Sequence, residues 1–277
     1  MTRIGPGFLA LPPRQTKPRT SGFTHVLDKG LSLVALDSLL ATAGESIDFL
    51  KLGWGTAYVS DGVKAKVALC RSAGVNVCLG GTMLEICVHQ HKLGDYVRWL
   101  RRLGISHVEV SDGALGMPVE RKRELIRSLS LEFWVLSEVG SKNPDDVVVA
   151  SDWVTEMAED LQAGASLLIA EARESGTVGI YLPSGEVRCG LVESIIAALP
   201  ADRIIFEAPR KDQQAWFIRR LGTIANLGNI AADEVVALET LRLGLRSDTL
   251  DLLPPADDTP AVSNGDRILQ APSTLLH

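Results

Sequence analysis

The sequence lacks the features that mark several large protein classes. No apolar stretch reaches the roughly 18 residues of a transmembrane helix, and the N-terminus shows no charged-then-apolar signal pattern. Basic residues are not in excess, because 28 Lys and Arg stand against 34 Asp and Glu. The four cysteines form no Cys-x-x-Cys pair, which argues against disulfides and structural zinc. We therefore expect a cytoplasmic protein with no membrane partner and no nucleic-acid partner.

The motifs of several enzyme classes are missing as well. There is no Gly-x-Ser-x-Gly elbow, no Walker loop and no dinucleotide fingerprint followed by an acid. His89 and His91 are two residues apart, so they would diverge on a helix and make a poor metal pair. His25 and His107 begin apolar runs, which predicts a place at the stability face of the fold rather than at its site. Any chemistry must come from other groups.

Eight short apolar runs organise the chain. Most of their ends are about thirty residues apart, which suits one strand, one helix and two loops per unit. The runs are continuous rather than alternating, which favours parallel strands buried on both faces. The pattern predicts an α/β fold, a single-domain (β/α)₈ TIM barrel, with strands near residues 25–28, 49–51, 75–79, 107–110, 133–138, 167–171, 204–207 and 224–227.

The barrel is expected to occupy residues 21–251. Residues 1–20, rich in Pro and basic groups, predict an irregular N-terminal arm, and residues 252–277 predict a flexible C-terminal tail. The connection over 173–190 is long enough to be either a lid over the barrel mouth or a simple hairpin insertion. The residues from Thr82 to Glu85 fit a capping box for the helix after the third strand.

Carboxylates gather at the ends of the predicted strands. Because the C-terminal ends of barrel strands face one mouth, these acids would converge there and raise each other's pKa. Mg²⁺ is a natural counter-ion, since it binds carboxylates together with water and substrate oxygens. The alternative is internal ion pairing, which we expect for about half of the set. The acids concerned are Asp28, Glu109, Asp112, Glu138, Glu171 and Glu207.

Two lysines and one glycine-containing strand end complete the candidate set. Lys51 ends an otherwise apolar run, so it either points into the mouth or forms an internal ion pair. Lys142 follows the fifth strand and could donate a proton or bind an anion, or be a solvated surface lysine. A Schiff-base aldolase using either lysine stays possible. Asn226, Gly228 and Asn229 suit a phosphate site after the eighth strand, or a tight turn with Asn229 as helix cap.

Ten motifs in one order, over about residues 17–249, carry a family resemblance. They are Lys17-Pro18-Arg19, Asp28-Lys29-Gly30, Lys51-Leu52-Gly53-Trp54-Gly55-Thr56, Gly80-Gly81-Thr82-x-x-Glu85, Glu109-Val110-Ser111-Asp112-Gly113, Glu138-Val139-Gly140-Ser141-Lys142, Glu171-Ala172-Arg173-Glu174-Ser175, Phe206-Glu207-Ala208-Pro209, Asn226-Leu227-Gly228-Asn229-Ile230 and Gly244-Leu245-Arg246-x-Asp248-Thr249. In this order they resemble phosphosulfolactate synthase.

The resemblance implies a function and a partner set. It implies a Mg²⁺-dependent carbon–sulfur lyase acting in the synthetic direction, which adds sulfite to C3 of phosphoenolpyruvate through a Mg²⁺-stabilised enediolate to give 2-phospho-3-sulfolactate. It also implies a homo-oligomer, possibly a trimer. The pathway served, coenzyme M biosynthesis among others, stays open.

The expected site follows from the same hypothesis. Lys142, Lys51 and Glu109 are the predicted catalytic residues. Glu109, Asp112, Glu138 and Glu171 are the predicted Mg²⁺ ligands. The anionic groups of the substrates are expected to bind Arg19, Arg173, Asn226, Gly228, Asn229 and Arg246.

One residue departs from the family pattern. The family usually has two lysines after Glu-Val-Gly, whereas here Ser141 takes the first place and Lys142 the second. The loop therefore keeps the proton donor and has one positive charge fewer. The same enolate chemistry with another nucleophile or another enolphosphate is one alternative. Because the family also occurs as stress-associated plant proteins, a non-catalytic barrel is the other.

The role of Lys142 gives a first prediction. Lys142→Ala should lower the turnover of sulfite addition by at least roughly 10²–10³, the usual loss on removing one electrostatic group from an active site. Steady-state kinetics measure the loss, and far-UV circular dichroism shows that the fold is intact. Full activity in the variant would remove Lys142 from the mechanism.

Overall fold

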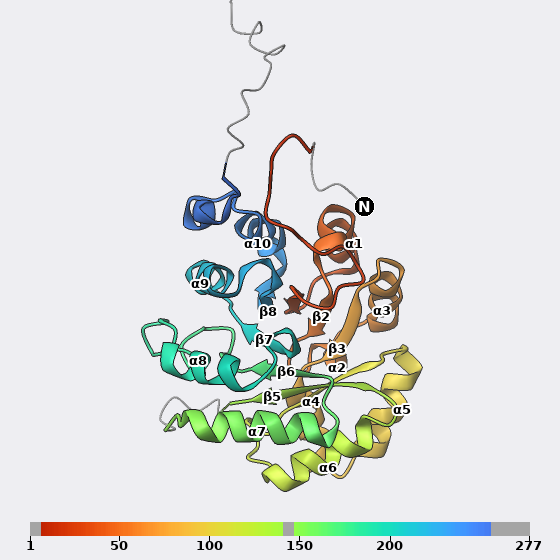
Figure 1. Cartoon of the computed structure of the whole chain (residues 1–277). Helices are drawn as coiled ribbons and strands as arrows, with labels where there is room; N and C mark the ends of the chain where they lie inside the picture. Colours follow the sequence, from red (N-terminus) through yellow and green to blue (C-terminus); the bar gives the residue numbers. More distant parts are fainter. Residues whose placement is uncertain (1–6, 141–146, 256–277) are drawn as a thin grey trace, which may run out of the picture.

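The computed structural model describes residues 7–140 and 147–255. Eight parallel strands form the centre, and helices surround them (Figure 1). The strands are β1 (Thr24–Asp28), β2 (Phe49–Leu52), β3 (Asn76–Leu79), β4 (His107–Val110), β5 (Trp134–Val139), β6 (Leu167–Ala170), β7 (Ile204–Glu207) and β8 (Asn226–Ala231). The hydrogen-bonded order β3-β2-β1-β8-β7-β6-β5-β4 is that of a barrel opened between β3 and β4. The predicted TIM-barrel class is confirmed.

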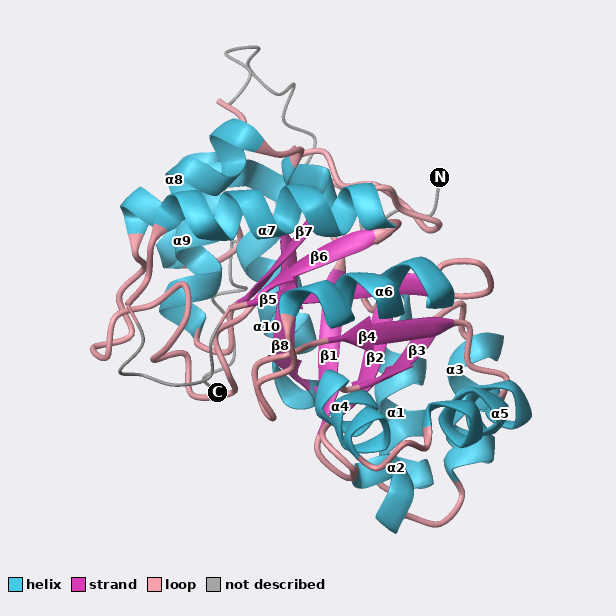
Figure 2. Cartoon of the chain, turned by 90° about the horizontal axis from the view of Figure 1, so that it is seen from below, coloured by secondary structure: helices cyan, strands magenta, loops and turns pink. Residues whose placement is uncertain are grey.

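The helices form the outer layer around the strands (Figure 2). They are α1 (Leu33–Ala43), α2 (Thr56–Val59), α3 (Val63–Ser72), α4 (Gly81–His89), α5 (Leu93–Leu103), α6 (Val119–Leu129), α7 (Ala150–Ala163), α8 (Cys189–Ala198), α9 (Lys211–Leu221) and α10 (Val235–Arg242). Short 3₁₀ segments join them: η1 (Gly44–Ser46), η2 (Ala201–Arg203), η3 (Gly222–Ile224), η4 (Ala232–Glu234) and η5 (Ser247–Leu252). Among the described residues, none of these helices has the length and apolar character needed to cross a bilayer.

Two apolar layers hold the barrel together. The larger lies between the sheet and the helices, where outward strand residues such as Val26, Leu50 and Val108 are buried. A smaller cluster fills the lower barrel interior and contains Phe49, Leu136, Leu167, Ile169 and Ile205. Because successive side chains of a strand point to opposite faces, these interior residues fix which strand positions face inward.

The eighth strand corrects the prediction, because it covers Asn226–Ala231 rather than 224–227. Its pairing with β1 shifts register: Thr24 is opposite Leu227, whereas Val26 is opposite Ile230. One extra residue in β8 therefore makes a bulge. Asn229 adopts a positive φ of 54° in it. Gly and Asn, taken as signs of a turn after the strand, mark an irregularity inside it.

The structure bears on two local predictions, the capping box at Thr82 and the lid or hairpin over residues 173–190. The capping box at Thr82 is wrong: α4 has Gly80 at its N-cap and no side-chain cap hydrogen bond. The long sixth connection contains the antiparallel bridge between Tyr181 and Val187. It is tied to α9 because the Gln213 amide donates to the carbonyls of Gly176 and Gly185 at 2.8 and 3.0 Å.

Side chains close the seam between β3 and β4, which are neighbours without ladder hydrogen bonds. The Gly81 amide at the start of α4 donates to Glu109 Oε1 of β4 at 2.7 Å. The Glu85 carboxylate of α4 accepts from Ser111 Oγ at 2.5 Å and from the amides of Ala114 and Leu115. Hydrogen bonds from helix α4 therefore connect the β3 side to the β4 side of the seam, where the two strands form no ladder.

The closeness of this seam gives a stability prediction. A Cβ at Gly81 would lie 2.8 Å from the Ser111 Cβ, inside van der Waals contact. Gly81→Ala should therefore lower the free energy of unfolding by about 1–3 kcal/mol, the usual cost of overpacking. The matched control is Gly94→Ala in α5, where the nearest atom is Arg98 at 3.5 Å. It should be neutral or stabilising by up to about 1 kcal/mol. Equal urea midpoints for the two variants would contradict this account.

Candidate functional site

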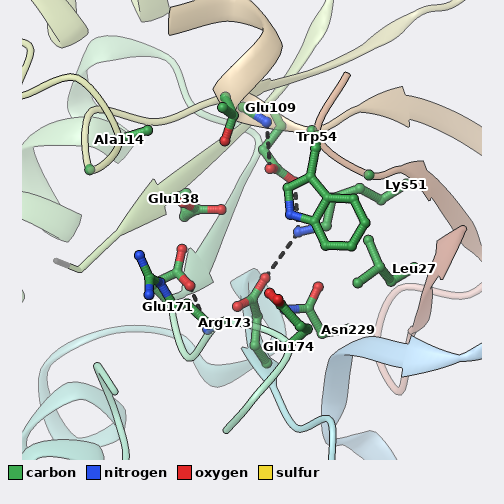
Figure 3. A pocket seen from close by; sticks show the side chains of 16 residues that line it. Leu27, Lys51, Trp54, Glu109, Ala114, Glu138, Glu171, Arg173, Glu174 and Asn229 are labelled. Carbon is green, nitrogen blue, oxygen red and sulfur yellow. Dashed lines mark hydrogen bonds and ion pairs between the residues drawn. The ribbon is translucent and has the colours of Figure 1, made fainter. Parts of the chain in front are cut away.

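A cavity of about 700 Å³ opens at the C-terminal ends of the strands. All eight strands contribute to it, either directly or through the loop that follows. Figure 3 shows Lys51, Glu109, Glu138 and Glu171 approaching the cavity from different strands. Five glutamates and two basic residues line it: Glu109, Glu138, Glu171, Glu174, Glu207, Lys51 and Arg173. The mouth predicted from the charged strand ends is present.

The charged side chains point inward because of strand parity. Phe49, Leu136, Ile169 and Ile205 belong to the apolar cluster of the barrel interior. Two residues further along the same strands, or just beyond them, stand Lys51, Glu138, Glu171 and Glu207, which therefore share the inward face. Aromatic contacts between Phe49 and the rings of Phe23, His25 and His107 support this floor. Apolar residues thus fill the interior below, and ionisable residues form the layer above.

Lys51 lies at the centre of the charged layer. Its Nζ is 3.0 Å from Glu207 Oε1 and 3.3 Å from Glu109 Oε2, and all three side chains are almost fully buried. Burial alone would lower the pKa of Lys51, but the charges of Glu109, Glu207, Glu138 and Glu171 raise it well above its ordinary value. The surrounding carboxylates therefore favour the charged form of Lys51. It both faces the cavity and forms the internal ion pair that the sequence left as an alternative.

Glu109 and Glu207 are held on their other sides by backbone amides. Glu109 Oε1 accepts from Gly81 N at 2.7 Å, and Glu207 Oε2 accepts from Ala172 N at 3.0 Å. Burial nevertheless raises the pKa of Glu109 to about 7, against the opposing charge of Lys51. A carboxyl that titrates near neutrality can hold or release a proton during a reaction. Glu207 was among the strand-end acids but had no predicted role, and it proves to be a principal partner of Lys51.

Backbone strain concentrates around the cavity. Four described non-glycine residues have positive φ, and three of them line it: Trp54 (49°), Arg173 (55°) and Asn229 (54°). Such conformations gather at functional sites, where the surrounding structure enforces them. The bulge in β8 accounts for Asn229, because an extra residue redirects the next side chain. Asn229 Oδ1 is buried without a hydrogen-bond partner among the described residues.

Several predicted residues do belong to the cavity. The structure brings together Lys51, Glu109, Glu138, Glu171, Arg173 and Asn229. The backbone N–H of Arg173 donates to Glu171 Oε1 at 2.5 Å, which ties the rim to the end of β6. Trp54, Thr82 and Glu174 also line the cavity and were not predicted as site residues. The motifs containing them were the available signal. Lys142 lies outside the described residues, so its role stays a prediction.

Arg19, which was predicted to bind substrate, does not line this cavity. Its guanidinium is 2.9 Å from Asp48 Oδ1 and donates to the Glu45 carbonyl, at the N-terminal end of the barrel. There it lines a second cavity, of about 720 Å³, with Phe23, His107 and Trp134. The described part of the arm runs across this end, since Arg14 pairs with Glu239 and Thr223 donates to the Pro13 carbonyl. The arm precedes the first strand and so reaches the strand starts.

Asn226, Gly228 and Arg246 also lie away from the cavity. Asn226 begins β8, where its side chain accepts from Phe23 N and donates to backbone carbonyls near β7. Gly228 lies inside β8, and a Cβ there would approach the Ile205 side chain at 2.9 Å. Arg246 follows α10, in the segment leading to η5, and does not line the cavity. Of the residues predicted for a phosphate site, Asn229 alone lines the cavity, and the phosphate site itself stays a prediction.

Two predicted acids of the strand-end set serve other partners. Asp28 follows the inward-facing Leu27, so parity points it outward, where its Oδ2 is 2.7 Å from Lys66 Nζ. Asp112 lies beyond the end of β4, and its Oδ1 is 3.8 Å from Lys122 Nζ on α6. Neither lines the cavity. Asp112 is therefore not placed with Glu109, Glu138 and Glu171, contrary to the predicted metal set.

Two donor sets near the cavity could hold a metal ion. Glu109, Glu138 and Glu171 offer carboxylate oxygens to the cavity, which suits a hard cation such as Mg²⁺. His25, Cys78 and Glu109 each offer one ligand atom, all within 4.8 Å of one another. That second set is less suitable, because burial lowers the pKa of His25 and raises that of Cys78, and Lys51 is beside Glu109. Carboxylate chemistry therefore favours the first set for Mg²⁺, whereas among the described residues only the second set has its ligand atoms gathered within 4.8 Å.

Comparisons with known proteins agree with the fold and name a family. The family model for (2R)-phospho-3-sulfolactate synthase (ComA) matches residues 12–248. Solved structures of similar fold include 3-keto-L-gulonate-6-phosphate decarboxylase from Vibrio cholerae, with 10% identity and a TM-score of 0.51 over 84% of this chain and 100% of that chain. Thiamine phosphate pyrophosphorylase from Pyrococcus furiosus has 12% identity and a TM-score of 0.50 over 85% and 99%. At such identities these structures show the barrel alone.

Curated relatives cover nearly the whole domain. Phosphosulfolactate synthase from Methanothermobacter thermautotrophicus is 44% identical over 245 residues, 86% of this chain and 95% of that protein. The Bacillus subtilis phosphosulfolactate synthase is 41% identical over 247 residues, 88% and 98% respectively. HEAT-STRESS-ASSOCIATED 32 from Arabidopsis thaliana is 25% identical over 261 residues, 83% and 88%. The resemblance seen in the ordered motifs is confirmed, and the chain belongs to the (2R)-phospho-3-sulfolactate synthase family.

Proposed function

We propose that this chain adds sulfite to C3 of phosphoenolpyruvate and forms 2-phospho-3-sulfolactate. The observation that carries the proposal is the buried Lys51 among Glu109, Glu138, Glu171 and Glu207 at the barrel mouth. An apolar core has no need of such a layer, whose burial is costly. The higher identity to named synthases, 44% against 25% for the plant stress protein, favours an enzyme over a non-catalytic barrel.

The reaction requires a C–S bond at C3 and a proton at C2. Sulfur attacks C3, the π electrons of the double bond move toward C2 and the carboxylate, and C2 then takes a proton while the phosphate ester is retained. The chain must therefore bind two anions together and hold negative charge beside C2. Lys51 supplies fixed positive charge at the cavity floor, and Arg173 supplies it at the rim.

Further positive charge is needed because the described lining carries five glutamates. Glu109, Glu138 and Glu171 are the residues that would hold Mg²⁺ there. When bound, the ion would supply Lewis-acid stabilisation of the charge that develops on the substrate carboxylate. The family resemblance assigns the proton for C2 to Lys142. Asn229, whose Oδ1 is unpartnered in the described structure, can accept a hydrogen bond from a bound molecule.

The raised pKa of Lys51 argues against a Schiff-base aldolase in which Lys51 is the nucleophilic amine. An amine nucleophile must be neutral, which requires a lowered pKa. The carboxylates around Lys51 raise its pKa instead and keep it protonated. We therefore propose an electrostatic role for Lys51 rather than a covalent one. Borohydride should trap no substrate on this lysine.

The central experiment uses phosphorus NMR to follow the conversion of phosphoenolpyruvate. Pure protein incubated with phosphoenolpyruvate, Mg²⁺ and sulfite should convert the enolphosphate signal into that of a saturated phosphate ester, with no free phosphate released. Removal of divalent ions with EDTA should stop the conversion, and excess Mg²⁺ should restore it. Phosphorus NMR with separate nucleophiles in place of sulfite identifies the true co-substrate. No conversion with any nucleophile, and no phosphoenolpyruvate binding by calorimetry, would refute the proposal.

A matched pair of variants tests the two ends of the barrel. Lys51→Met should lower the turnover of sulfite addition by roughly 10²–10³ because it removes fixed charge from the mouth. Arg19→Met, which breaks a comparably buried ion pair at the other end, should keep turnover within about threefold while losing stability.

A second variant separates catalysis from folding. Lys51→Met/Glu207→Gln removes both members of the 3.0 Å ion pair, so it leaves less uncompensated buried charge than Lys51→Met alone. It should regain thermal stability without regaining turnover. Full turnover in the double variant would show that Lys51 serves only as the structural partner of Glu207.

A further inference from the structure

A buried lysine outside the barrel lies at the point where two strands separate. The pairing of β4 with β5 ends at Val110 and Ser137, so the Glu138 carbonyl lies one residue beyond the last pair. Lys122 of α6 donates to that carbonyl from Nζ at 2.7 Å. The Lys122 side chain is fully buried. Its ammonium group therefore binds the β5 backbone just beyond the last residue pair of β4 with β5.

Three carboxylates hold the Lys122 ammonium in place. Glu156 Oε1 and Asp160 Oδ2, both on α7, are 2.6 and 3.0 Å from Nζ, and Asp112 Oδ1 is 3.8 Å away. Burial would lower the pKa of Lys122, but Asp112, Asp160 and Glu156 raise it. Ser137 donates from Oγ to Asp160 Oδ2 at 2.7 Å. The network thus joins α6 and α7 to two consecutive residues of β5.

Those consecutive residues face opposite sides of the sheet. The Ser137 side chain points outward to Asp160, and the Glu138 side chain lines the cavity. Lys122 binds the backbone carbonyl of the same residue whose carboxylate enters the site. The carbonyl carbon and the side chain are both attached to the Glu138 Cα, so a shift of this carbonyl can redirect the carboxylate. Groups behind a site that orient the residues touching the ligand typically change activity or metal affinity 10–100-fold.

We infer that Lys122 is a positioning residue, whose ammonium fixes the Glu138 carboxylate in the cavity through the Glu138 carbonyl. Asp112 belongs to this network as a partner of Lys122, which explains why it does not line the cavity. The inference about kinetics rests on the proposed function. The inference about the position of Glu138 is independent of it.

The variants must keep the fold. Lys122→Met alone leaves Asp160 buried without its ion-pair partner, so the working variant is Lys122→Met/Asp160→Asn. Its matched control is Arg14→Met/Glu239→Gln, which removes a buried 2.8 Å ion pair at the opposite end of the barrel. Both should lose stability in urea. Only the first should lower kcat for sulfite addition, by about 10–100-fold.

A double-mutant cycle with Glu138 separates positioning from general destabilisation. If Lys122 acts through Glu138, the Lys122→Met/Asp160→Asn change should cost less than about twofold in kcat in a Glu138→Gln background. A loss that is the same in both backgrounds would overturn the inference.

A crystal structure of Lys122→Met/Asp160→Asn gives a readout that does not need turnover. The Glu138 carboxylate should be displaced from its wild-type position or lose defined density, while Glu109 and Lys51 keep theirs. A Glu138 carboxylate in its wild-type position overturns the inference, whatever the kinetics. If the wild-type protein adds no sulfite, the proposed function fails, and this structure still decides the role of Lys122.

Discussion

The mutual repulsion of buried carboxylates is the constraint on which this site depends. Glu109, Glu138, Glu171 and Glu207 are almost fully buried at one end of the barrel. Burial, together with the charges of Glu138 and Glu207, raises the pKa of Glu109. Lys51 relieves part of it by pairing with two of them. A further cation at the mouth would relieve the remaining repulsion, which supports the proposed divalent ion.

Rigid surroundings keep these charges apart and oriented. Below them is the apolar interior around Phe49, Leu136 and Ile205. At the seam, the Gly81 amide holds Glu109 from one side. Outside the strands of the barrel, Lys122 donates a hydrogen bond to the Glu138 carbonyl. The site is therefore supported by the two places where β4 departs from regular pairing, its free edge toward β3 and its early end beside β5.

The sequence predicted site residues correctly where the alternation of side chains along a strand decides which residues point into the barrel mouth. The spacing of apolar runs predicted the barrel, and charge at the end of a run predicted Lys51, Glu109, Glu138 and Glu171 at its mouth. Parity also explains an error, since Asp28 is one position out of phase and points outward to Lys66. Asp112 lies beyond its strand, where parity no longer applies. Arg19 was assigned by motif alone, although an arm before the first strand meets the opposite end of the barrel.

Irregular backbone could not be predicted in the same way. The bulge in β8 moved the strand end from 227 to Ala231 and turned Asn229 into the cavity. The positive φ at Trp54 and Arg173 was not predicted from the sequence either. Lys122 was not singled out in the sequence, because its burial depends on neighbours on β5 and α7 that are distant along the chain.

A crystal structure of the protein with phosphoenolpyruvate and Mg²⁺ tests the central claim most directly. The account predicts phosphoenolpyruvate in the cavity between Lys51 and Arg173, with the metal density bounded by Glu109, Glu138 and Glu171. Phosphoenolpyruvate bound instead in the cavity beside Arg19, or a charged mouth that stays empty at saturating ligand, would contradict it.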